Sequence, residues 1–91
     1  MVKIGKYDYT KSTVSGKKLR VVVDGKIINF GDSSYQHFND KTKLLDLSLN
    51  HNDEKRRQSY LKRAKGIKDK DGKLTHLDPL SPNYHAIKIL W

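Results

Sequence analysis

The chain has 91 residues and carries 19 Lys or Arg against 10 Asp or Glu, which gives a formal net charge of +9. A chain of this length forms one domain at most, and with 35% apolar and 32% charged residues its core must be thin. The absence of cysteine excludes a disulfide framework and thiolate metal sites, and no run of about 18 apolar residues is present to cross a membrane.

The positive charge lies in two blocks. Residues 1–26 hold seven Lys or Arg against two acids, and residues 51–70 hold eight against three, whereas the segments between and after them are close to neutral. Such blocks suit an acidic partner, either phosphate groups or a carboxylate-rich protein surface. The alternative is that the lysines only keep a small domain in solution.

Residues 1–17 are expected to form a basic extended arm, followed by a single domain over residues 18–91. The segment 5–17 mixes Gly5, Gly16, lysines and small polar residues, which is typical of a chain that orders on a partner. Within this arm, residues 2–4 could add an edge strand.

The strongest local signal is a β-hairpin over residues 19–30. Asp24-Gly25 separates two apolar runs and predicts a two-residue type I′ turn. That turn pairs Val23 with Lys26 and puts five apolar side chains on one face, which is the expected core. These side chains are Leu19, Val21, Val23, Ile28 and Phe30.

Two features are expected between the hairpin and the next helix. The run Gly31-Asp32-Ser33-Ser34 predicts a turn and a helix N-cap, followed by a helix of one or two turns with Tyr35 and Phe38 on it. Four leucines then follow at irregular spacing, which favours a loop packed over the open end of the core: Leu44, Leu45, Leu47 and Leu49.

The clearest helix is predicted over residues 53–65. Asn52 is its expected N-cap, Asp53 and Glu54 occupy the first turn, and Gly66 follows its end. At 100° per residue, one face carries Arg57, Tyr60, Leu61 and Ala64, joined by Asp53. The opposite face carries Lys55, Lys62, Arg63 and Lys65, with Arg56 at its flank.

The basic side chains of this helix are the expected contacts to phosphate groups or to an acidic protein surface. The first charge block adds three more candidates. The full set is Lys17, Lys18, Arg20, Lys55, Arg56, Lys62, Arg63 and Lys65.

Arg57 falls within the buried stripe of the helix, where an unpaired guanidinium would be strongly destabilising. We therefore expect a bidentate pair with Asp53 or Asp32. In the alternative, Arg57 extends past Tyr60 to solvent. The expected structural network comprises Asp32, Asp53, Arg57, Tyr60 and Trp91.

The end of the sequence predicts a solvated turn over residues 68–73 and a last helix with Ser81 as N-cap and Pro82 at its first position. The expected apolar edge of this helix comprises Tyr84, Ile87, Leu90 and Trp91. Because Ile87, Ile89 and Trp91 also alternate, a terminal strand is the alternative. Trp91 is expected to be held against the core or a neighbouring molecule.

No motif for catalysis, metal binding or cofactor binding is present. The histidines at 37, 51, 76 and 85 lack a two-ligand helical spacing, and GxGxxG, Walker and GxSxG patterns are absent. The run 50–53 invites comparison with hairpin-plus-helix metal nucleases, in which a histidine activates water. The predicted helix holds no histidine ligand, so the preferred interpretation is that His51 bonds to the backbone or to Asp53 at the start of the helix.

Three patterns carry a resemblance: FGDSxY from Phe30, HxDxxRRxxYxxR from His51, and the terminal Leu90-Trp91. Over residues 18–91 the chain resembles a family of small basic proteins of tailed phages and large double-stranded DNA viruses. Members place another histidine after the arginine that corresponds to Arg63, where this chain has Ala64. The family carries no assigned catalytic residue, and the resemblance implies location in the virion or in the host cell cytoplasm during infection.

The sequence therefore predicts an α+β domain: a β-hairpin or three-stranded antiparallel sheet packed against two or three short helices. The first functional expectation is a non-enzymatic minor or auxiliary virion protein, docked on the capsid or another virion protein through basic and aromatic surfaces. The alternative is a nucleic-acid-binding accessory protein that contacts the phosphate backbone of DNA or RNA. A small metal-dependent nuclease is a remote alternative, and no cofactor, metal or membrane is expected as a partner.

Overall fold

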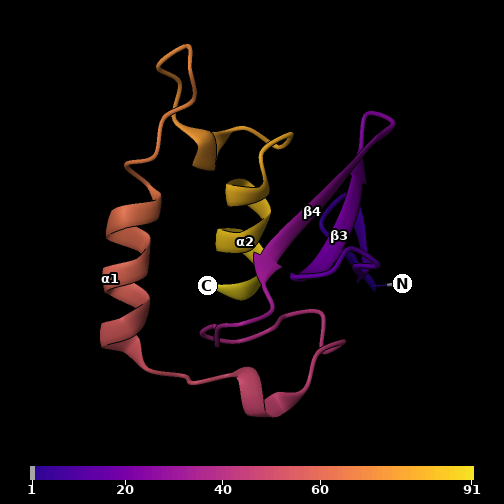
Figure 1. Cartoon of the computed structure of the whole chain (residues 1–91), viewed down its shortest axis with the longest axis vertical. Helices are drawn as coiled ribbons and strands as arrows, with labels where there is room; N and C mark the ends of the chain where they lie inside the picture. The colour runs from indigo at the N-terminus through magenta and orange to yellow at the C-terminus, as the bar shows by residue number, and fades with distance from the viewer. Residues whose placement is uncertain (1) are drawn as a thin grey trace.

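The computed structural model describes residues 2–91 and has the predicted α+β fold. Four antiparallel strands form one sheet in the order β1 (Val2–Ile4), β2 (Tyr7–Lys11), β3 (Lys17–Val23) and β4 (Lys26–Asp32). Two α-helices follow, α1 (Glu54–Ala64) and α2 (Pro82–Leu90), with the short 3-10 helices η1 (Leu47–Leu49) and η2 (Thr75–Leu77) before each. As Figure 1 shows, α2 lies between α1 and the sheet. None of the helices in residues 2–91 is long and apolar enough to span a membrane.

The central hairpin has the predicted register. Val23 pairs with Lys26, and the predicted pairs further along the ladder are also present. Asp24 and Gly25 have φ angles of 51° and 77°, as the two central residues of a type I′ turn require. The predicted core face is confirmed, since all five of its side chains are buried: Leu19, Val21, Val23, Ile28 and Phe30.

The amino-terminal segment is part of the sheet. Val2–Ile4 forms the edge strand that the sequence suggested, and β2 continues the sheet where an extended arm was expected. Tyr9 of β2 pairs with Val21 and is fully buried. The prediction of an arm that orders on a partner is corrected for these residues, because β2 pairs with β3 and β1 pairs with β2 of the same chain.

Helix α2 closes the core, and a buried histidine joins it to β2. The hydroxyl of Tyr9 donates to Nδ1 of His85 at 2.9 Å, and Nε2 of His85 lies 2.6 Å from the carbonyl oxygen of Pro79. A neutral imidazole with its proton on Nε2 satisfies both contacts. Burial lowers the pKa of His85 and raises the pKa of Tyr9 to about 12.

The start of α2 is as predicted, but its buried face is not. Ser81 is the N-cap and Pro82 the first helical residue. The buried residues are His85, Ala86, Ile89 and Leu90, whereas Tyr84 and Ile87 of the predicted edge are only partly buried. The alternative of a terminal strand is wrong, because the helix continues to Leu90.

The segment after β4 contains a turn in place of the predicted short helix. Oδ1 of Asp32 accepts the backbone N–H of Ser34 at 2.8 Å, which forms an Asx turn. Tyr35 is left 69% exposed. Of the four leucines expected to cover the core, Leu44 and Leu45 pack against it, whereas Leu47 is exposed.

Candidate functional site

A cleft of about 860 Å³ lies between α1 on one side and β4 with α2 on the other. Its floor is formed by Phe30 and Gly31 of β4 with Ala86 and Leu90 of α2, and the side chains of Phe30, Ala86 and Leu90 are buried beneath it. The arrangement of the helices that border it is visible in Figure 1. This cleft is larger than a second cleft of about 250 Å³, which is lined by residues of β2 and β3 and of the turn before β2.

Both basic blocks of the sequence contribute to this cleft. Its lining contains five basic side chains and a single acidic one. The first block supplies two lysines from the start of β3, and the second supplies three residues from α1. Because these groups meet in a concave site, their potentials add where a ligand would enter. The basic residues are Lys17, Lys18, Lys55, Arg56 and Arg63, and the acid is Asp32.

The other three predicted contact residues lie outside the cleft. Lys62 and Lys65 are exposed on α1 but do not line it. Arg20 lies on β3, where its Nε donates to Oγ1 of Thr10 at 3.2 Å. The predicted set therefore divides into a convergent group of five and three separate side chains.

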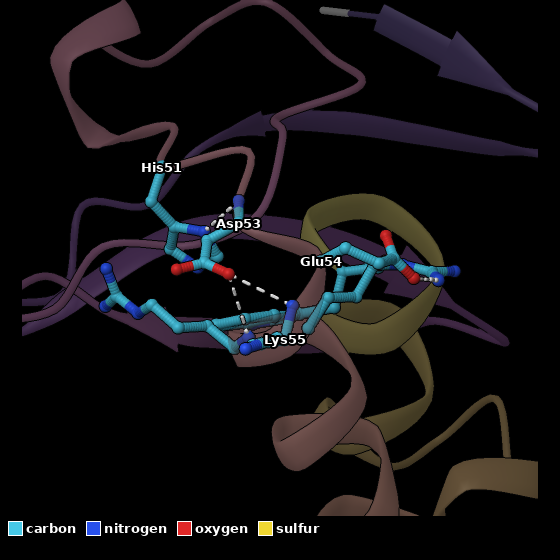
Figure 2. Close-up of polar contacts among 7 residues, drawn as sticks. His51, Asp53, Glu54 and Lys55 are labelled. Atoms are coloured by element: carbon cyan, nitrogen blue, oxygen red, sulfur yellow. Dashed lines mark hydrogen bonds and ion pairs between the residues drawn. The ribbon is translucent and has the colours of Figure 1, made fainter.

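The start of α1 places Lys55 and Arg56 at the mouth of the cleft. Oδ1 of Asp53 accepts the backbone N–H groups of Lys55 at 3.0 Å and of Arg56 at 3.3 Å. Asp53 is thus the N-cap, and the predicted cap Asn52 lies one residue earlier with a φ of 52°. Nδ1 of His51 in turn accepts the N–H of Asp53 at 2.9 Å, and Figure 2 shows His51 beside Asp53 at this end of the helix.

The position of His51 agrees with the preferred interpretation of that residue, a backbone contact at the start of the helix. Burial lowers its pKa, and the positive charge of Arg56 acts in the same direction. Within residues 2–91 no group of three or more His, Asp or Glu is placed to hold a metal ion.

Trp91 attaches α1 to the rest of the molecule. Its ring stacks on Tyr60 with the centroids 4.0 Å apart and the planes at 8°. Nε of Arg57 donates to the main-chain oxygen of Trp91 at 2.7 Å, and its guanidinium lies 5.3 Å from the centre of the Phe38 ring. The expectation that Trp91 is held in place is confirmed.

The predicted carboxylate partners of Arg57 are wrong. Its ion pair is with Glu54, three residues earlier on the same helix, at 3.1 Å. Asp53 is occupied in capping α1 and Asp32 in the turn after β4. Of the expected network, the structure therefore brings together Arg57, Tyr60 and Trp91 only. Burial raises the pKa of Tyr60 in this cluster.

Polar side chains connect the two walls of the cleft at its ends. Nδ2 of Asn83 at the start of α2 donates to the carbonyl oxygen of Ala64 at 2.8 Å and to Oγ1 of Thr75 at 2.9 Å. At the other end of α1, a guanidinium nitrogen of Arg56 donates to Oε1 of Gln36 at 3.0 Å. The sequence offered no periodic signal for these contacts, because both Asn83 and Gln36 act across the fold.

Lys18 is a buried cation in the lining. Only 6% of it is exposed, and its Nζ lies 3.0 Å from Nδ1 of His37. Nε2 of His37 donates to Oδ1 of Asn50 at 2.6 Å, so Nδ1 is left to accept from the ammonium. Burial lowers the pKa of Lys18 and of His37. The negative charges of Asp32 and Asp40 favour the charged form of Lys18 and so oppose the effect of burial on its pKa.

Gly31 is required for the shape of the floor. Its φ of 78° lies in the left-handed region. A Cβ at this position would lie 3.0 Å from Cδ1 of Leu90 and 3.1 Å from Cβ of Lys18. Any other residue would therefore strain the backbone and require the side chains of Leu90 and Lys18 to shift by a few tenths of an ångström.

Most residues of the three patterns that carry the resemblance to viral proteins also line the cleft. They are Phe30, Gly31, Asp32, Tyr35, Arg56, Tyr60, Arg63, Leu90 and Trp91. No protein-family model matches the chain, and comparison with curated proteins and with solved structures gives no significant match.

Proposed function

We propose that this protein is a non-enzymatic accessory protein that binds a nucleic acid through its phosphate backbone, with the cleft as the contact surface. The observation that carries the proposal is the convergence of five basic side chains, from two blocks far apart in the sequence, around one concave surface with a single acid. A surface that served solubility alone would not need its charges to converge.

The two walls offer different donors to a phosphate group. Arg56 and Arg63 on α1 present guanidinium groups, which bind phosphate oxygens in a bidentate manner. On the opposite wall, the exposed Lys17 supplies a point charge, whereas the buried Lys18 acts only through its positive field. A backbone lying in the cleft would thus be contacted from both sides, and such contacts position a nucleic acid without reading its sequence.

The environment of the histidines supports binding over the nuclease alternative. Both ring nitrogens of His37 and His85 are hydrogen-bonded and both side chains are fully buried. Nδ1 of His51 accepts a backbone amide, and its Nε2 has no hydrogen-bond partner but is itself buried. A histidine that activates water must present a free nitrogen to the substrate. These three side chains support the fold, which agrees with a protein that binds and does not cleave.

A second candidate is the auxiliary virion protein, docked on a capsid or another virion protein. Val22 and Ile27 form a cross-strand pair in the central hairpin and are 54% and 58% exposed. An exposed apolar pair of this kind suits a protein partner. The viral setting, in the virion or in the host cytoplasm, rests on the sequence resemblance. Purified particles that lack the protein by mass spectrometry would rule this candidate out.

Salt dependence tests the nucleic-acid proposal. The affinity for DNA or RNA should fall linearly on a plot of log affinity against log salt, by about 0.7 to 0.9 per phosphate contact. With several of the five basic residues engaged, a slope magnitude of about 2 to 4 is expected in a fluorescence anisotropy titration. A slope near zero, or no binding at low salt, would contradict the proposal.

A further inference from the structure

The cleft has more apolar and aromatic surface than phosphate binding requires. Its basic residues lie beside the exposed side chains of Tyr35 and Ile67 and the half-buried, stacked rings of Tyr60 and Trp91. Phosphate groups gain nothing from an apolar surface, because burying a charge without polar partners is unfavourable. A ligand that fills the cleft must therefore carry flat apolar groups as well as negative charges.

The size of the cleft limits the form of nucleic acid that can fill it. A volume of about 860 Å³ lies within the range of sites that take small ligands. A duplex keeps the faces of its bases stacked inside, so only its phosphates would reach the rim of the cleft. Unpaired nucleotides expose these faces, and proteins bind them on aromatic side chains within basic grooves.

Tyr35 provides an open aromatic surface at this place. It lines the cleft and is 69% exposed, which is unusual for a large ring in a small fold. The turn formed by Asp32 and Ser34 precedes it, and Gln36 next to it is bonded to Arg56 across the cleft. Tyr35 is thus the sequence neighbour of the residue that the Arg56 guanidinium contacts, and this guanidinium can hold the adjacent phosphate.

We propose that the cleft binds single-stranded nucleic acid, with an unpaired base stacked on Tyr35 and the flanking phosphates held by Arg56, Arg63 and Lys17. The inference rests on the proposed function and specifies its ligand. An acidic peptide would satisfy the basic residues, but its carboxylate side chains offer no planar face to stack on the exposed ring of Tyr35.

The single tryptophan of the chain makes occupancy measurable. Trp91 lines the cleft, so its fluorescence should be quenched by a strand of about 12 thymidines and not by heparin, which carries charge without bases. The strand should bind at least about tenfold more tightly than a duplex of equal phosphate count at the same salt.

Replacement of the exposed ring separates stacking from charge. Tyr35→Ala should weaken binding of the thymidine strand by about 5-fold to 150-fold, the range for loss of one stacked base, and leave heparin binding unchanged. The control is Leu77→Ala, which removes an apolar side chain that is 66% exposed and lies outside the cleft lining. It should change neither affinity.

The outcomes distinguish failure of the single-strand inference from failure of the proposed function. Equal affinity for strand and duplex, or an unchanged affinity after Tyr35→Ala, would overturn the single-strand inference and leave phosphate binding in place. Tighter binding of a polyglutamate peptide than of either nucleic acid would overturn both, in favour of a protein partner. Absence of binding to every polyanion would overturn the proposed function itself.

Discussion

The layer formed by the sheet and α2 differs from α1 in how it is held. In the first, four side chains from four elements are essentially inaccessible to solvent: Tyr9, Leu19, Phe30 and Ile89. In α1 only Ala64 is buried, and the helix is attached through a ring stack and through hydrogen bonds made by Arg57, Asn83 and Arg56. The sheet and α2 therefore supply most of the stability, whereas α1 lies at a distance from them that leaves the cleft open.

The largest expected effect comes from breaking the stable layer. Phe30→Ala removes a fully buried ring that makes edge contacts with Tyr9, at a centroid distance of 5.8 Å. It should lower the free energy of unfolding by about 3 to 5 kcal/mol in urea denaturation. Val22→Ala on the exposed face should change it by less than about 0.5 kcal/mol. Similar losses for the two variants would contradict this assignment of the core.

A smaller effect is expected from loosening α1. Arg57→Lys keeps the charge but loses the planar group that bonds both Trp91 and Glu54. It should cost about 1 kcal/mol, which for a domain of this size lowers the melting temperature by about 4 to 8 °C.

Hydrogen exchange shows which part of the fold loses stability in the Arg57→Lys variant. Exchange should accelerate in α1 and stay unchanged in β3 and β4, because the stable layer does not depend on this contact. The exposed residue Arg63 supplies the control, Arg63→Lys, which should leave the melting temperature unchanged. An equal shift for both variants would show that Arg57 does not attach the helix.

The mildest test changes no residue. Burial lowers the pKa of His37 and His85 below the ordinary value of 6.5, so the unfolded chain binds more protons than the folded one just below that pH. Stability should therefore be greatest above about pH 6.5 and fall as the pH decreases below it. Urea midpoints at about pH 7.5 and pH 5 measure this, and identical midpoints would mean that these histidines are not held neutral.

The sequence predicted the parts of the fold whose signals are local. The hairpin followed from Asp24-Gly25 between alternating apolar residues, and α2 from Ser81-Pro82. Strand β2 could not be predicted from its own residues, because Tyr7 and Tyr9 lie among glycine, lysine and other polar residues. The strand forms because it pairs with β3. The short helix predicted after β4 does not form, since Asp32 bonds to the backbone in a turn that the same residues also favour.

The candidate site was predicted only as a set of charges. The sequence identified Lys17, Lys18, Lys55, Arg56 and Arg63, but their convergence depends on the distance at which Trp91 and Asn83 hold α1 from the core. No pattern along one element encodes that distance. The partner of Arg57 was missed for a similar reason, because the main-chain oxygen of Trp91 carries no side-chain signal.

The most direct test of the central claim compares two double variants of α1 that remove the same charge. Lys55→Gln with Arg63→Gln changes residues that line the cleft, whereas Lys62→Gln with Lys65→Gln changes exposed residues outside its lining. The measurement is the dissociation constant of each for a strand of about 12 nucleotides at one salt concentration. The account predicts a loss at least about tenfold greater for the cleft pair, equal to about 1.4 kcal/mol. Equal losses would contradict it, because binding would then depend on net charge and not on the cleft.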